Sequence, residues 1–375
     1  MNAISTLGLP KFPTDDGERG AFLPSFVHKL DKFVSDIYIE RGYGRGLEIN
    51  DKCYLSNDKN NIHFVSHEET YKQDLVIGLK APTLEELSII RRGAFLIGML
   101  HYESRPKLVE ALKMHGIFSY SLDSIIDDRH QRLVVSYEMT ASNGVREAYN
   151  EIVKRRSDFL MSNRAPFLVA IMGMGYLGIE AGKASFLKFG DTGIDSVTRK
   201  RVLPGAAVVY LEKKATHCKK FISDLFPGVD LLIDATKRVD FTKYIIPNEW
   251  LGYLKKEAVI LDLTCDPYDT TVSPIQVKAI EGIPSGTLNQ YVFETHDVAW
   301  EKIPESVDKK NRRVVVSCNG WPGLTPREVM PIYGEQIMPF VRLLIRKGGK
   351  LSLESNDPQE RALYRSSLEA YLASQ

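Results

Sequence analysis

A glycine-rich segment directly after an apolar run is the clearest sign of chemistry in the sequence. The run PFLVAIM (166–172) leads into the pattern GxGxxG at 173–178, which is followed by the helix-like IEAGKASFLKFG. Missing side chains at this spacing allow a tight turn, close approach of backbone to a pyrophosphate, and close packing of helix on strand. A purely structural turn is the alternative, but the flanking strand and helix favour dinucleotide binding. The residues expected at the cofactor are Gly173, Gly175, Tyr176, Leu177 and Gly178.

The end of the next strand indicates which dinucleotide is expected. In such folds an acidic residue there accepts hydrogen bonds from the adenosine ribose. The run AAVVYLE (206–212) ends at Glu212, 34 positions after Gly178, whereas about 20 is usual. We assign the surplus to a polar surface insertion at 190–205. A carboxylate repels a 2′-phosphate, so Glu212 favours NAD(H), although Lys213 and Lys214 leave NADP(H) possible and Glu212 could simply be a solvated strand end.

Two further residues with useful chemistry stand where predicted strands end. Lys80 follows DLVIGLK (74–80), and His101 follows AFLIGMLH (94–101). The carboxyl ends of parallel strands are where open α/β sheets place their ligands. A lysine can polarise a carbonyl or imine, and a histidine can transfer a proton near neutral pH. Taken singly, each residue could equally be structural.

Alternation of strands and helices predicts how these residues are positioned. In the first part of the chain, strands are expected at 4–10, 74–80, 94–101 and 117–123, with helices at 24–37, 83–92 and 105–116. After a connecting helix at 144–160, strands are expected at 166–172, 206–212, 230–235, 258–263 and 313–318, and helices at 323–348 and 359–373. Such alternation implies parallel sheets covered by helices.

We therefore expect an α/β protein with two Rossmann-like, doubly wound parallel-sheet domains and a cleft between them. Residues 1–142 and 320–375 form the expected catalytic domain, and residues 143–319 form the expected NAD(H)-binding domain. The length of 375 residues fits two domains.

The overall composition excludes several classes of partner. Lys and Arg number 49 against 48 Asp and Glu, so no net charge attracts nucleic acid or an acidic membrane. The four cysteines have neither CxxC nor zinc-like spacing, so we expect reduced thiols and no metal. The N-terminus lacks the features of a signal peptide, and no apolar run is long enough to span a bilayer. We expect a cytoplasmic protein that acts on a small molecule.

Several blocks together resemble one protein family. GLPKFPTDDGERGAFLP (8–24), YIERGYGRG (38–46), DLVIGLKAP (74–82), FLIGMLHYES (95–104), MTASNGV (139–145), GMGYLG (173–178) and VILDLTCDPYD (259–269) are similar, in order and spacing, to the alanine dehydrogenase and transhydrogenase α-subunit family. The same blocks also resemble the lysine-forming saccharopine dehydrogenases. The segment WPGLTPREVMPIYGEQIMPF (321–340) looks closer to the saccharopine dehydrogenase sequence than to the alanine dehydrogenase sequence. The resemblance implies hydride transfer between NAD(H) and the amine-bearing carbon of an amino acid.

The resemblance also implies roles for individual residues. Arg19 matches the arginine that grips the substrate carboxylate, Lys80 and His101 match the active-site lysine and histidine, and Asp266 matches an aspartate near substrate and nicotinamide. Thr140 matches a residue near the cofactor. Arg19 could otherwise be a surface arginine and Asp266 a turn former beside a proline.

Departures from the alanine-type pattern bear on the substrate. Phe12 stands where an acidic residue is usual, Gly320 where asparagine is usual, and Trp321 where methionine is usual. Trp321 could stack near the nicotinamide or pack the domain junction. These departures favour an opine-like secondary amine such as saccharopine, with 2-oxo acid and amino acid as reaction partners. The alternatives are a simple alanine-type oxidative deaminase and a silent NAD(H)-binding regulatory subunit, and relatives of this kind range from monomers to hexamers.

Overall fold

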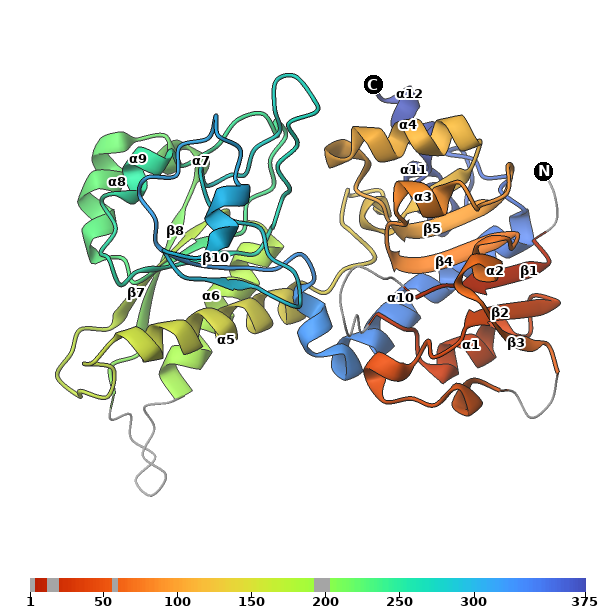
Figure 1. Ribbon diagram of the computed structural model, residues 1–375, viewed down its shortest axis with the longest axis horizontal. Helices are drawn as coiled ribbons and strands as arrows, with labels where there is room; N and C mark the ends of the chain where they lie inside the picture. Colours follow the sequence, from red (N-terminus) through yellow and green to blue (C-terminus); the bar gives the residue numbers. More distant parts are fainter. Residues whose placement is uncertain (1–3, 12–19, 56–59, 192–202) are drawn as a thin grey trace. The chain divides into compact units, whose positions relative to one another are not determined.

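The computed structural model describes residues 4–11, 20–55, 60–191 and 203–375, with only the backbone at 190–191. The chain divides into two compact units, Met1–Ser136 with Thr325–Gln375, and Tyr137–Leu324 (Figure 1). The boundary between the two units lies between residues 136 and 137, because the long helix α5 (Tyr137–Arg155) belongs wholly to the second unit. The domain functions and the cleft expected from the sequence stay predictions.

The first unit is built on a parallel sheet whose described strands run in the order β3-β2-β1-β4-β5-β6. This is the order of a doubly wound fold, in which connections leave β1 and β4 in opposite directions. The carboxyl ends of all these strands meet at one edge of the sheet. The strands are β1 (Thr6–Leu9), β2 (Asp36–Glu40), β3 (Ile62–Val65), β4 (Leu75–Lys80), β5 (Phe95–Met99) and β6 (Phe118–Ser121).

Helices cover this sheet, and the C-terminal segment returns to it. On one face α4 packs Leu108 and Leu112 into a core with Val76 of β4 and Leu96 of β5. Elsewhere in the unit α1 lies against α10, where Phe26 contacts Gly334. The helices are α1 (Pro24–Leu30), α2 (His67–Tyr71), α3 (Leu84–Leu87), α4 (Pro106–His115), α10 (Pro326–Lys347), α11 (Pro358–Arg365) and α12 (Leu368–Ala373).

The second unit has its own sheet, with the described strands in the order β11-β12-β10-β9-β7-β8. All pairs are parallel except that β11 runs antiparallel to β12. The strands are β7 (Phe167–Met172), β8 (Ala206–Leu211), β9 (Leu231–Asp234), β10 (Val259–Asp262), β11 (Val292–Phe293) and β12 (Val314–Ser317). The helices besides α5 are α6 (Tyr176–Asp191), α7 (Lys213–Thr216), α8 (Lys219–Leu225) and α9 (Asn248–Leu251).

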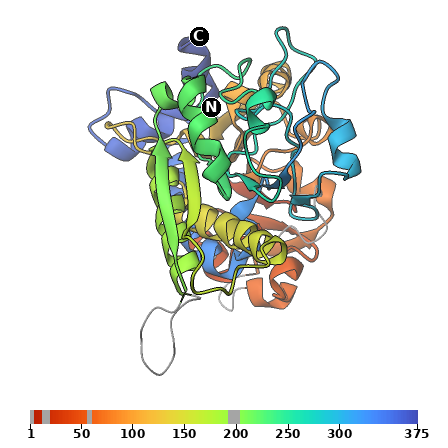
Figure 2. The same ribbon diagram turned by 90° about the vertical axis from the view of Figure 1, so that its left-hand side faces the viewer.

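Alternate residues of these strands build two separate cores, one on each face of the sheet. Val169 and Ile171 of β7 point into a core shared with α5 and α6, whereas Ala170 and Met172 point into a core shared with α8 and α9. Figure 2 faces this unit, with α5 in yellow beside the green strands. The predicted α/β fold with helices on both faces of parallel sheets is thereby confirmed.

Several expected elements have different limits. The helix expected at 24–37 ends at Leu30, and the residues after its turn form β2. The strands β2, β3 and β11 were missing from the prediction. The C-terminal helix is divided at Ser366 and Ser367, because Ser366 O accepts the Ser121 N–H of β6 at 2.8 Å and Ser367 caps α12. Most of the insertion expected at 190–205 lies outside the described residues.

Short 3-10 turns complete the described secondary structure, at Arg45–Leu47, Asp51–Tyr54, Tyr102–Ser104, Leu122–Ser124, Phe226–Gly228, Val298–Lys302 and Trp321–Leu324. None of the helices within the described ranges combines the length and apolar character needed to cross a membrane.

Candidate active site

The glycine pattern forms a tight turn between β7 and α6. Gly173 has φ +95°, a conformation that side-chain-bearing residues rarely adopt. The first bond of the helix runs from the Ile179 N–H to the Gly175 carbonyl, at 3.0 Å. The strands β8 and β9 lie on opposite sides of β7, so the turn stands where the chain connections change direction. This is the position at which doubly wound sheets bind ligands.

A hypothetical Cβ at each glycine shows what the turn requires. At Gly173 it would lie 2.6 Å from the Ala235 carbonyl oxygen, and at Gly178 it would lie 2.1 Å from the Gly173 carbonyl oxygen. Both glycines therefore let backbone segments pack. At Gly175 a Cβ would meet no atom within 4 Å. Packing within the protein does not explain this glycine, whereas a pyrophosphate at the helix N-terminus would occupy such a space.

The other residues that the sequence predicts at the cofactor differ in how exposed they are. Tyr176 is 58% exposed and stacks on Tyr137 with ring centroids 5.8 Å apart, and Leu177 packs against the core. Glu212 is exposed directly after β8 and precedes α7. Thr140 is half-buried in the first turns of α5.

Trp321 lies in the core of the second unit. It is 2% exposed, its indole N–H donates to the Asp262 carbonyl at 3.2 Å, and its own carbonyl accepts from the Asn143 side chain at 3.0 Å. Both the indole N–H and the backbone carbonyl of Trp321 thus have hydrogen-bond partners within the protein. This placement favours the packing alternative over stacking on a nicotinamide.

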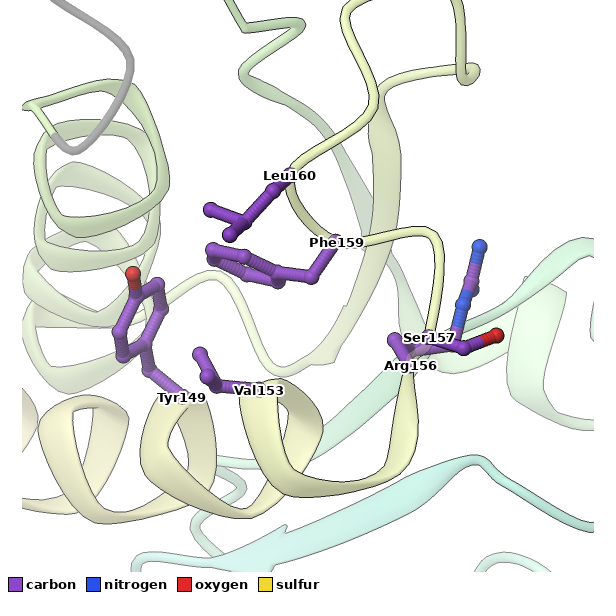
Figure 3. A pocket seen from close by; sticks show the side chains of 6 residues that line it. All are labelled: Tyr149, Val153, Arg156, Ser157, Phe159 and Leu160. Carbon is purple, nitrogen blue, oxygen red and sulfur yellow. The ribbon is translucent and has the colours of Figure 1, made fainter.

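A hollow of about 420 Å³ in the second unit is not part of this turn. It is lined by Tyr149, Val153, Arg156, Ser157, Phe159 and Leu160 (Figure 3). These residues end α5 and precede β7, so the hollow lies at the amino ends of the strands. The glycine turn lies at their carboxyl ends, and the two are separate features.

In the first unit, Lys80 and His101 stand at the carboxyl ends of neighbouring strands. Lys80 is the last residue of β4 and is half-buried. His101 follows β5 in a left-handed conformation with φ 49°, and its side chain is 42% exposed. Gly98 fits between the two strands, because a Cβ there would lie 3.0 Å from the Lys80 carbonyl oxygen. Phe12 and Arg19, which follow β1 in the sequence, lie outside the described residues.

Asp123 contacts both the side chain and the backbone of His101. The sequence did not predict a role for Asp123. Its Oδ2 lies 3.3 Å from His101 Nδ1, and its Oδ1 accepts the His101 backbone N–H at 3.2 Å. Burial acts to raise the pKa of Asp123, but His101, Ser121 and Arg132 outweigh it and hold this pKa well below its usual range. Asp123 is therefore an anion that orients the imidazole. Its place just after β6 is the signal that could have identified it.

Asp266 follows β10 in a turn that Asp262 organises. The Asp262 carboxylate accepts the backbone N–H groups of Thr264 at 3.1 Å and Cys265 at 2.8 Å. Its other oxygen accepts from the ammonium of Lys278 at 2.6 Å. Burial raises the pKa of Asp262, but Lys278 and these hydrogen bonds outweigh it and lower the pKa overall. Asp262 and Lys278 form an ion pair that fixes the backbone next to Asp266.

A second buried carboxyl, Asp234, ends β9 beside β10. Thr236 donates to its Oδ1 through the backbone N–H at 3.0 Å and through the hydroxyl at 2.7 Å. Burial, and then the charge of Asp262, raise the pKa of Asp234 to about 7. Near neutral pH this carboxyl therefore exchanges a proton. Sequence analysis missed Asp234, although its position at a strand end was the same signal that identified Lys80.

Comparisons with known proteins find similar sequences and similar folds. Residues 8–141 match the family model described as "Alanine dehydrogenase/PNT, N-terminal domain". Alanine dehydrogenase 1 of Staphylococcus aureus, strain bovine RF122 / ET3-1, is 21% identical over 361 residues, which cover 90% of this chain and 87% of the relative.

Solved structures show the same fold. An L-alanine dehydrogenase superposes with a TM-score of 0.69 at 18% identity, over 97% of this chain and 94% of that one. A transhydrogenase from Sinorhizobium meliloti superposes with a TM-score of 0.60 at 16% identity, over 91% and 94%. The family model thus covers most of the first unit, and the superpositions show that the two units have the folds of these proteins.

Proposed function

We propose that the protein is an NAD(H)-dependent amino-acid dehydrogenase that interconverts a 2-amino acid with its 2-oxo acid and ammonium. The observation that carries this proposal is the glycine turn after β7, where Gly175 faces open space at the amino end of α6. The relatives named alanine dehydrogenase support the amino-acid substrate. The second unit is then the dinucleotide domain and the first unit the substrate domain.

NAD⁺, when bound, supplies a nicotinamide C4 that accepts hydride from the substrate Cα. The backbone N–H groups at the start of α6 would bind the pyrophosphate, since the turn offers them without a covering side chain. Glu212 would accept hydrogen bonds from the ribose hydroxyls and repel a 2′-phosphate, which makes NAD(H) the expected cofactor. Thr140 would lie beside the cofactor, as the family resemblance implies.

His101 would transfer protons through Nε2. Its Nδ1 faces the anionic Asp123, so the proton on the neutral ring belongs on Nδ1 and the lone pair on Nε2. The same carboxylate stabilises the ring after Nε2 has taken up a proton. Lys80 would polarise the carbonyl or imine of the substrate, and Arg19 would grip its carboxylate through two parallel hydrogen bonds.

Asp266 would accept a hydrogen bond from the substrate amine or the attacking water, because a carboxylate near the reacting carbon orients such donors. In the oxidative direction, hydride loss leaves an imine, and water addition with proton transfers then yields the 2-oxo acid and ammonium.

The substrate preferred from the sequence was an opine-like secondary amine. The relative and the solved structure named alanine dehydrogenase favour the alternative, a simple 2-amino acid. The resemblance of 321–340 to saccharopine dehydrogenases and the departures at Phe12, Gly320 and Trp321 support the opine-like candidate. Most of that segment forms α10 of the first unit.

A single assay separates these possibilities. The protein is mixed with NADH or NADPH, a panel of 2-oxo acids, and either ammonium or a panel of amino acids as amine donors, and nicotinamide absorbance is followed. We expect NADH oxidation with a small 2-oxo acid and ammonium. Oxidation only with an amino acid as amine would establish the opine-like candidate. Tight NADH binding without turnover on any pair would establish the silent subunit instead.

A further inference from the structure

The side chain of Asp266 is held by an arginine from a different loop. Arg238 lies beyond the end of β9, and its Nη2 donates to Asp266 Oδ2 at 2.7 Å. The Arg238 side chain is 3% exposed, whereas that of Asp266 is 21% exposed. The carboxylate thus faces outward from a buried cation. This contact restricts the rotation of the Asp266 side chain but leaves part of its carboxylate exposed to solvent.

Arg238 is itself fixed from several sides. Its Nη1 donates to the Lys243 carbonyl at 3.1 Å, and its guanidinium lies 5.1 Å from the centroid of the Phe241 ring. Its Nε is buried and has no acceptor among the residues that the structure describes. A buried donor without a partner lowers stability. Stability alone therefore does not account for an arginine at this position, which suggests that its contact with Asp266 serves the reaction.

The backbone beneath Asp266 is equally restrained. Cys265, the preceding residue, has φ 47°, and its N–H is bound by the Asp262 carboxylate at 2.8 Å. Asp262 is in turn paired with buried Lys278. Ser317 of β12 donates to the same Asp262 oxygen at 3.0 Å. With the backbone fixed by this network, the remaining freedom of Asp266 is the rotation of its side chain, which Arg238 limits.

We propose that Arg238 is a positioning residue that holds the Asp266 carboxylate in one orientation for the reacting amine or water. This inference rests on the proposed function, in which Asp266 contacts the substrate. The ion pairs around Asp266 support it: Asp262 is neutralised by Lys278, and Arg238 is the cation that contacts the Asp266 carboxylate itself.

The test compares Arg238→Met and Arg238→Lys with Asp266→Asn and with the double variant Arg238→Met/Asp266→Asn. We expect Arg238→Met to lower kcat by roughly 10- to 100-fold, the range for a misplaced catalytic group, with the Kd for NADH unchanged. Arg238→Lys is expected to restore part of kcat, because it keeps the charge but not the planar fork. In the Asp266→Asn background, Arg238→Met is expected to have no further effect, since both changes act through one carboxylate.

The comparison of kcat with the Kd for NADH, together with partial rescue by the conservative variant, supplies a readout that a merely structural role would not give. Without the guanidinium the Asp266 side chain is free to rotate, so kcat is expected to fall in Arg238→Met while the Kd for NADH stays at the wild-type value, and Arg238→Lys is expected to recover part of kcat. Arg313→Lys is the matched control. Arg313 is another buried arginine of this unit, at the amino end of β12, and donates only to carbonyls in the contacts described. The Arg313→Lys variant is expected to shift the melting temperature without lowering kcat.

The outcomes are separable. Asp266→Asn with reduced turnover, together with Arg238→Met and Arg238→Lys at the wild-type rate, would overturn the role of Arg238 and leave the proposed function standing. Multiplicative loss in the double variant would likewise overturn it, because it would show that Arg238 acts elsewhere. A folded wild type that binds NADH but turns over no substrate pair would overturn the proposed function, and the role of Arg238 with it.

Discussion

Replacing Gly175 by valine is expected to abolish NADH binding in a protein that still folds. A Cβ at this position meets no protein atom within 4 Å, so the valine side chain enters open space at the amino end of α6. That is the space assigned to the pyrophosphate. Losing two hydrogen bonds to charged phosphate oxygens, at about 1.5–3 kcal/mol each, corresponds to an affinity loss of about 10²- to 10⁴-fold.

The neighbouring Gly178 provides the opposite case. A Cβ there would lie 2.1 Å from the Gly173 carbonyl oxygen, a backbone atom that cannot swing away. Gly178→Ala is therefore expected to destabilise the second unit by about 3 kcal/mol, or roughly 6–12 °C in Tm for a unit of its size. Gly175→Val replaces a glycine at the helix start and is expected to cost no more than about 1 kcal/mol, or roughly 2–4 °C.

Fluorescence titration with NADH and thermal denaturation of both variants, with wild type as the reference, measure the two effects. Near-native melting with lost affinity in Gly175→Val, against clear destabilisation in Gly178→Ala, is the expected pair of results. A folded Gly175→Val with wild-type affinity for NADH would refute the assignment of this turn to the cofactor.

Three further predictions concern other residues. Lys80→Ala and His101→Ala should each lower kcat by ~10²-fold or more, the scale of a positioned proton-transfer group, with NADH affinity near wild type; steady-state kinetics at near-native turnover would remove that residue from the mechanism. Glu212→Ser should narrow the ratio of kcat/KM for NADH over NADPH, because it removes repulsion of a 2′-phosphate; a wild type at least tenfold better with NADPH would contradict the reasoning. Asp234 has a pKa raised to about 7 in the folded state, so its favourable contribution is complete below its unfolded pKa, about 3.9, and is lost as pH rises through about 7. Asp234→Asn should therefore raise Tm relative to wild type more at pH 8 than at pH 5, and an equal shift at both pH values would show that Asp234 does not titrate in this range.

The sequence predicted the elements that are buried on both faces best. Continuous apolar runs such as 166–172 and 258–263 can only be central strands, and both appear within one residue of their expected limits. The strand β3 (Ile62–Val65) was missed because only Ile62 of its four residues is buried, which leaves no apolar run to recognise. The start of strand β2 was predicted as part of a helix, because Phe33 and Val34 continue the apolar spacing of α1.

Residues whose role depends on contacts distant in the sequence were harder to predict. Lys80 and His101 could be found because a strand end is a local signal. Arg238 and Lys278 carry no such signal: their partners Asp266 and Asp262 lie 28 and 16 positions away, and only the folded loops bring them together. The two readings of Trp321 could not be separated without knowing whether its indole N–H finds a partner inside the protein.

The central claim is that hydride moves between the nicotinamide C4 and the carbon that carries the amine. The most direct measurement uses NADH deuterated at either C4 position, together with ammonium and the 2-oxo acid selected by the substrate panel, followed by mass spectrometry and NMR of the amino acid formed. One deuterium at Cα, from one of the two C4 positions, is the predicted result. Product without deuterium at Cα from either labelled NADH, or deuterium at another carbon, would contradict the account.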